Sequence, residues 1–213
     1  MTFPNDSSTV EDSGRWTPVT DPLVPVADGH TTLGDDDLEG LIPTYIMTRG
    51  ELNDAEQRNI TLAVLRRPPT PIRLLDDPYL RRLHKAMFGE VWRWAGIYRR
   101  LETNIGVDPT LISVEVRTLV DDARAWIDHA TFEPDEIAAR FHHRLMLIHP
   151  FENGNGRHGR LAADYLANGL GRPQFSWGAH QNVDTRELRH RYRTALQHGN
   201  NGDLTELLAF VRS

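Results

Sequence analysis

Apolar residues recur at helical spacing through almost the whole chain after about residue 27. The most continuous stripe comprises Val116, Leu119, Val120, Ala123, Trp126, Ile127 and Ala130. Residues spaced in this way share one face of a helix, and that face has to be buried against other helices. Because the sequence shows no internal repeat, the pattern predicts one all-α domain built as a helical bundle.

Local signals indicate where the expected helices begin and end. Their starts carry capping-box spacing or an early proline: Thr48 with Glu51, Asp77–Pro78, Pro134, and Asp184 with Glu187. Their ends carry glycine or proline: Pro68–Pro69, Gly89, His149–Pro150, and Gly169 to Pro173. The apolar spacing from Leu204 to Val211 predicts one last short helix.

Two segments lack the apolar spacing that predicts a helix of the bundle. Residues 1–27 are polar and carry four prolines, so we expect a flexible arm ahead of a single domain over 28–213. That domain would include an N-terminal helical segment over about 35–67. Gly96 and Gly106 bracket a stretch that includes Tyr98, which predicts a small β-hairpin there.

Charge and cysteine content limit the function. The formal net charge is −6 and the pI is about 5.9, so no overall positive field attracts nucleic acid, and a nucleic-acid substrate is not expected. The chain has no cysteine, which excludes a disulfide framework and a cysteine nucleophile. We find neither a secretory signal nor an apolar run of the roughly 20 residues that span a bilayer. We therefore expect a cytoplasmic protein without a membrane partner.

The stretch HPFENGNGRHGR, residues 149–160, carries most of the chemistry. Gly154 and Gly156 lack side chains, so backbone N–H groups can approach a bound oxyanion where the loop enters a helix N-terminus. Asn155, between them, tolerates left-handed geometry and offers an amide to a phosphate oxygen. A glycine loop of this kind alone is usually only a turn, but the charged and titratable residues beside it favour a binding site.

Three charged or titratable residues flank this loop. Arg157 and Arg160 are three apart in the first turn of the expected helix, so both can project toward one side and hold a polyphosphate. His149 ends the preceding helix, and an ordinary histidine pKa near 6.5 suits a general base. Together these residues predict a phosphate site with a base beside it.

The segment resembles the signature of the Fic family, HxFx(D/E)GNGRxxR. The matching positions are His149, Phe151, Gly154, Asn155, Gly156, Arg157 and Arg160. GEVWRWAGIYR (89–99) and FHHRLMLIHPF (141–151) are also similar to the family, and the resemblance covers roughly residues 30–212. The segment from Asp28 to Ile60 looks closest to the branch called mobile mystery protein B.

The resemblance implies a Fic-type helical bundle with its hairpin flap over the active-site loop, and an enzyme that moves AMP from ATP onto a Ser, Thr or Tyr hydroxyl. His149 would take the proton from that hydroxyl. Gly154, Asn155 and Gly156 would hold the phosphates. Arg157 would neutralise the departing pyrophosphate and Arg160 would hold the γ-phosphate. Phe151 would anchor the loop in the core.

Asn153 departs from the signature, where active members carry Asp or Glu to hold Mg²⁺ or Mn²⁺. A neutral amide oxygen is a poorer ligand for a hard cation, so the metal role of Asn153 is in doubt. Glu152 occupies a variable position beside it. The alternatives are a Fic enzyme with another donor, and a catalytically weak or silent nucleotide-binding module.

The resemblance also implies partners. A protein substrate would pair with the flap, at Thr103, Asn104 and Ile105. Residues 35–40, DDDLEG, partly match the family's inhibitory pattern, so Glu39 is a candidate to pair with Arg160 and restrain the enzyme, or to orient water for removal of AMP. A regulatory or antitoxin partner and a homodimer stay open.

Overall fold

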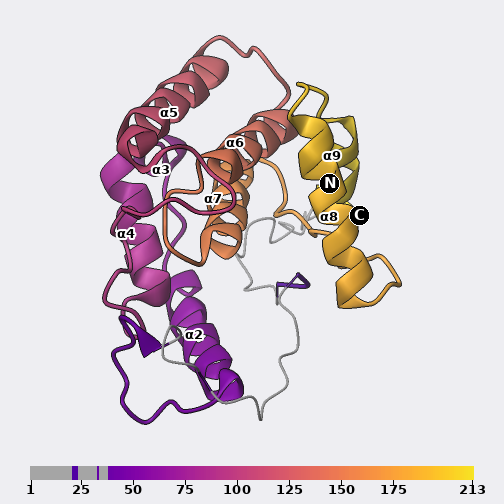
Figure 1. Cartoon of the computed structure of the whole chain (residues 1–213). Helices are drawn as coiled ribbons and strands as arrows, with labels where there is room; N and C mark the ends of the chain where they lie inside the picture. The colour runs from indigo at the N-terminus through magenta and orange to yellow at the C-terminus, as the bar shows by residue number, and fades with distance from the viewer. Residues whose placement is uncertain (1–20, 24–32, 34–37) are drawn as a thin grey trace, which may run out of the picture.

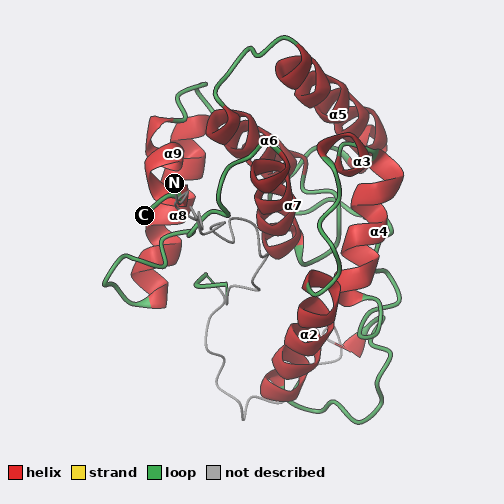
Figure 2. Cartoon of the chain, turned by 180° about the vertical axis from the view of Figure 1, so that it is seen from behind, coloured by secondary structure: helices red, strands yellow, loops and turns green. Residues whose placement is uncertain are grey.

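The computed structural model describes residues 21–23, 33 and 38–213. Its regular structure in these residues is helical, as Figures 1 and 2 show, in agreement with the expected all-α class. The helices are α2 (Arg49–Val64), α3 (Pro71–Leu74), α4 (Asp77–Phe88), the 3₁₀ helix η1 (Pro109–Leu111), α5 (Ile112–Asp128), α6 (Pro134–Ile148), α7 (Asn155–Gly169), α8 (Thr185–Gly199) and α9 (Thr205–Val211).

Helices α6 and α7 form the centre of the bundle, and the other helices pack around them (Figure 1). On one side α5 packs on α6, and α4 bridges α2 and α7. On the other side α9 packs on α6, and α8 packs on α9. The central position of α7 follows from its sequence, because Leu161 to Ala167 is apolar or small almost all round and is buried. None of the described helices is long and apolar enough to cross a membrane.

The local signals placed most helix boundaries correctly. Thr48 and Glu51 form a complete capping box at the start of α2. Asp76, and not Asp77, caps α4, because its carboxylate accepts the Tyr79 N–H. The short helices α3 and η1 were not expected. Each begins with a proline in its first turn, Pro71 and Pro109, where the missing N–H costs no helical hydrogen bond.

The expected hairpin over 97–107 is wrong. These residues are bends without strand pairing, and the described part of the chain contains only an isolated bridge between Leu41 and Trp92. A side chain replaces the ladder: the Arg99 guanidinium donates to the carbonyls of Leu101 (2.9 Å) and Val107 (2.5 Å). The Arg99 and Val107 N–H groups donate to the carbonyls of Pro150 and Ile148, so this segment bonds to the end of α6 and to a buried arginine and not to a second strand.

The expected flexible arm, 1–27, lies mostly outside the described residues. Its described portion, 21–23, packs on the bundle: the Leu23 side chain is 5% exposed and the Asp21 carboxylate pairs with Arg160. The arm is therefore not loose at this point. Of the expected N-terminal helical segment, residues 35–37 lie outside the described residues, and α2 forms the regular part.

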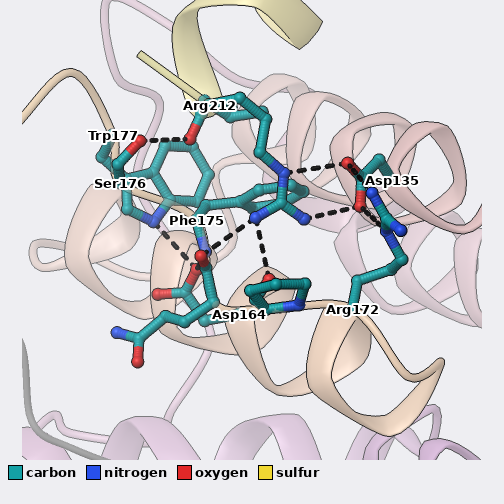
Figure 3. Close-up of polar contacts among 10 residues, drawn as sticks. Asp135, Asp164, Arg172, Phe175, Ser176, Trp177 and Arg212 are labelled. Atoms are coloured by element: carbon teal, nitrogen blue, oxygen red, sulfur yellow. Dashed lines mark hydrogen bonds and ion pairs between the residues drawn. The ribbon is translucent and has the colours of Figure 1, made fainter. Parts of the chain in front are cut away.

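Asp135, in the first turn of α6, ties the C-terminal end of the chain to the centre (Figure 3). It accepts from the Arg212 Nη2 and Nε at 2.5 and 2.8 Å and from the Arg172 Nε at 3.0 Å. Arg212 also donates to the Pro173 carbonyl at 2.9 Å and lies 4.3 Å from the Phe175 ring centroid. These hydrogen bonds from Arg212, and then from Arg172, lower the pKa of the Asp135 carboxyl.

We expect Asp135→Asn to lower the free energy of unfolding by about 1–2 kcal/mol at neutral pH, because it removes a charged acceptor of two arginines. A carboxyl with a depressed pKa stabilises the fold above its unfolded pKa of about 3.9 and loses that effect as the pH falls through the folded pKa. Urea unfolding at pH 7 and pH 3 should therefore show a difference that shrinks in acid. Glu187→Gln, in an exposed pair with Arg191, is the matched control and should change stability by less than about 0.5 kcal/mol. An equal loss in both variants would contradict the role of Asp135.

Candidate functional site

The loop between α6 and α7 is held in one shape by contacts to the core. The Asn155 amide spans it, with Oδ1 accepting the Phe151 N–H at 2.9 Å and Nδ2 donating to the Phe151 carbonyl at 2.7 Å. Phe151 is 1% exposed, as its anchoring role requires. Gly154 has a left-handed φ of 78°, and a Cβ there would lie 2.6 Å from the Phe88 ring. Only glycine fits this position without strain or a clash.

This geometry corrects the expectation for Asn155. Both ends of its side-chain amide are used on Phe151, so the amide shapes the loop and is not the group that meets a phosphate. The left-handed residue is Gly154, and Asn155 is the first residue of α7. What Asn155 presents to a ligand is its backbone N–H.

The start of α7 has N–H groups that suit a bound anion. Its first helical hydrogen bond runs from the His158 N–H to the Gly154 carbonyl, so the N–H groups of Asn155, Gly156 and Arg157 precede that bond and have no acceptor within the helix. These groups also lie at the positive end of a 15-residue helix. The Gly154 N–H is already bonded, because the Asn153 Oδ1 accepts it at 2.7 Å.

Arg157 and Arg160 line the same cavity of about 60 Å³, as their spacing predicted. Each arginine is paired with a carboxylate. The Arg157 Nη1 donates to the Glu56 Oε2 on α2 at 2.7 Å, and the Glu56 side chain is 6% exposed. The Arg160 Nε donates to the Asp21 Oδ2 at 3.1 Å. Burial opposes the charge of Arg160, but Asp21 raises the pKa of its guanidinium above the usual range. Both cations are therefore neutralised in this state.

The expected pair between Glu39 and Arg160 is wrong. Glu39 is exposed, and Arg160 pairs with Asp21 instead. A glutamate from the expected N-terminal segment does reach the motif, but it is Glu56, and it pairs with Arg157. Nothing local marked either carboxylate, because they are 139 and 101 residues away from their arginines along the chain.

His149 ends α6 in the left-handed region, with φ 51° and ψ 60°. An L-residue other than glycine adopts this conformation at a cost of about 1–2 kcal/mol, so the surroundings must impose it. They do so through Arg99, whose Nε donates to the His149 carbonyl at 2.7 Å. Gly106 packs on the other side, where a Cβ would lie 2.9 Å from the His149 Cβ. Burial, and then Arg99, lowers the pKa of His149, which keeps the ring neutral.

His84, on α4, is a site residue that sequence reasoning missed. Its Nδ1 accepts the Gly96 N–H at 3.0 Å, so its Nε2 carries the proton that it donates to the Asn153 carbonyl at 3.0 Å. The ring is fully buried and stacks 3.7 Å from the Phe151 ring centroid. Burial lowers the pKa of His84 well below its usual value. His84 therefore positions the loop as a neutral ring. Its only sequence signal was its inward position on the α4 stripe.

Asp164 forms part of the wall of the arginine cavity. Its Oδ1 accepts the Phe175 N–H at 3.1 Å and the Trp177 Nε1–H at 3.0 Å, which fixes the 175–177 segment against α7. Burial raises the pKa of the Asp164 carboxyl well above its usual value. Trp177 has a left-handed φ of 52°. Asp164 therefore positions the cavity wall.

The described residues contain no group of three or more His, Asp or Glu side chains that could hold a metal ion. The one motif oxygen expected to bind the ion belongs to the neutral Asn153 amide, which already accepts the Gly154 N–H. Hard cations prefer charged carboxylate oxygens.

The three residues expected to dock a target, Thr103, Asn104 and Ile105, are exposed on the loop that replaces the hairpin. The Thr103 hydroxyl donates to the Ile105 carbonyl, which turns the loop on itself. Gly106 follows directly and packs against His149, so this exposed loop lies beside the histidine.

Comparison with known proteins points to one family. Residues 74–167 match the model of the Fic/DOC family. Over 133 residues the chain is 28% identical to a protein of Aedes aegypti named protein adenylyltransferase Fic, which covers 61% of this chain and 25% of that relative. The chain thus spans about a quarter of the length of this curated relative.

Solved structures show the same fold. The N-terminal FIC domain of Bep8 from Bartonella sp. 1-1C superposes with a TM-score of 0.63 at 16% identity, covering 83% of this chain and 95% of that one. BepC from Bartonella tribocorum, solved with bound AMPPNP, gives 0.60 at 18%, covering 82% and 95%. The match to the Fic/DOC family model runs from the end of α3 into α7 and contains the motif loop, and the chain shares the fold of these Fic domains.

Proposed function

We propose that this protein transfers AMP from ATP to a hydroxyl of a protein side chain, and that the described state is a restrained one. The observation that carries the proposal is the start of α7, where three N–H groups without helical acceptors lie beside two motif arginines and a neutral histidine. The relative from Aedes aegypti is named a protein adenylyltransferase, and the BepC structure holds a nucleotide analogue. Both support this substrate class.

In the proposed reaction the His149 ring takes the proton of the attacking hydroxyl. The hydroxyl oxygen forms a bond to the α-phosphorus, the bond from that phosphorus to the bridging oxygen breaks, and pyrophosphate leaves. The N–H groups of Asn155, Gly156 and Arg157 stabilise phosphate charge, Arg157 faces the leaving group and Arg160 holds the γ-phosphate. The exposed loop 103–105 would bring the target hydroxyl close to His149.

The two carboxylates supply the restraint. Glu56 and Asp21 occupy the arginines that a triphosphate would need, so nucleotide binding has to displace them or share the cations with them. Glu56 is also held in place by the Trp92 Nε1–H, which donates to its Oε1 at 2.7 Å. Both oxygens of the Glu56 carboxylate therefore accept a hydrogen bond, one from Trp92 and one from Arg157.

We expect Glu56→Gln and Asp21→Asn each to raise self-modification with ATP about tenfold, because each frees an arginine while keeping the shape of the side chain. Intact-mass spectrometry would detect the gain of one AMP. Glu39→Gln is the control and should match wild type, because Glu39 does not contact the site. A rise in the Glu39→Gln protein alone would contradict this assignment of the restraint.

The rate in the Glu56→Gln protein should be independent of pH above neutrality and should fall in acid with an apparent pKa below 6.5, because burial lowers the pKa of His149 and a base must be neutral to act. His149→Ala should lose at least about 100-fold in turnover and keep its affinity for ATP. An acid limb centred above 6.5, or an active His149→Ala protein, would rule out His149 as the base.

The alternative is a module that binds nucleotide without turnover or uses another donor, and the neutral, already bonded Asn153 amide favours it. We expect Asn153→Asp in the Glu56→Gln background to raise the rate with Mg²⁺, because it restores a carboxylate oxygen. Activity only in this double variant would support the silent module. Activity without the Asp would support AMP transfer by the natural protein.

A further inference from the structure

A basic groove lies on α4 outside the arginine cavity. Arg81, Arg82 and Lys85 share one stripe of α4, three and four residues apart, and Arg93 lies across from them. All four side chains are exposed. The groove has a volume of about 580 Å³, which exceeds that of the arginine cavity.

The charges in this groove are only partly neutralised. Arg82 has an acidic partner, Asp76, but at 3.6 Å and with both side chains well exposed. Arg81 donates through Nε to the Gly96 carbonyl at 3.0 Å and its guanidinium lies 5.2 Å from the Tyr98 ring centroid, but it has no carboxylate partner among the described residues. Lys85 and Arg93 make no ion pair within the described part of the chain. On a chain of net charge −6, this is a local concentration of positive charge.

The groove is also partly apolar. Its floor includes Trp92 and Ala95, which are 6% and 4% exposed, and its rims carry Ile42 and Ile97, which are 40% and 47% exposed. A cationic wall with an apolar floor and rim suits a segment that carries both negative charge and a bulky apolar side chain. Ile97 also begins the stretch that leads along the chain into the exposed loop beside His149.

We propose that this groove docks an extended acidic peptide segment of a protein partner, with carboxylates on Lys85 and Arg93 and an aliphatic or aromatic side chain on the Ile42–Ile97 rim. Peptide is favoured over nucleic acid because the exposed rim is aliphatic, because the Trp92 ring is too buried to stack on a base, and because the chain as a whole is acidic. The inference does not depend on AMP transfer, because docking needs no nucleotide.

The test is fluorescence anisotropy with a labelled peptide of about ten residues, rich in Glu and Asp around a central Leu, at low salt. Lys85→Glu/Arg93→Glu should weaken binding at least about tenfold, and Lys85→Gln/Arg93→Gln by less. Arg189→Glu/Arg193→Glu, on the exposed face of α8, makes the same change in charge elsewhere and should bind as wild type does. Replacing the central Leu by Ser should weaken binding several-fold.

The proposal would be overturned by no binding at low salt, by equal losses in both charge-reversed pairs, by no effect of the Leu to Ser change, or by equally tight binding of a single-stranded oligonucleotide of matched charge. Circular dichroism of each variant would show that the fold is intact, as expected for exposed positions. Retained binding by Lys85→Glu/Arg93→Glu would place the peptide elsewhere.

Discussion

The pair of hydrogen bonds from the Asn155 amide to the Phe151 backbone is the contact on which the site depends. It closes the loop over four residues and leaves Gly154 in the left-handed region against Phe88. His84 also holds the loop, because its Nε2–H donates to the Asn153 carbonyl. With the loop fixed, α7 starts with its N–H groups directed out of the helix, and the phosphate cradle follows from ordinary helix geometry.

Charge then decides whether the cradle is accessible. Two buried or half-buried arginines without anions would be costly, so a resting protein needs carboxylates on them. Glu56 and Asp21 meet this need from α2 and from the N-terminal part of the chain. The same contacts occupy the groups that a triphosphate would use. Stability of the free state and restraint of the proposed activity therefore share one cause.

Helix caps and apolar stripes could be predicted from the sequence, because they depend on residues that are close together in the chain. The capping box of Thr48 and Glu51, and the inward stripe of α5, gave helix positions because both depend on neighbours in the chain. The spacing of Arg157 and Arg160 correctly predicted that both side chains reach one cavity. The hairpin was wrongly predicted, because nothing in the local sequence shows that Arg99 bonds the carbonyls of Leu101 and Val107. The partners of Arg157 and Arg160 were missed because long-range ion pairs leave no periodic signal.

The most direct test of a phosphate site closed by two carboxylates is calorimetric titration of ATP into wild type and into the Glu56→Gln/Asp21→Asn double variant. The account predicts at least about tenfold tighter ATP binding in the double variant and a much smaller gain for adenosine, which has no phosphate for the freed arginines. Equal affinities for ATP in the two proteins, or an equal gain for adenosine, would contradict it.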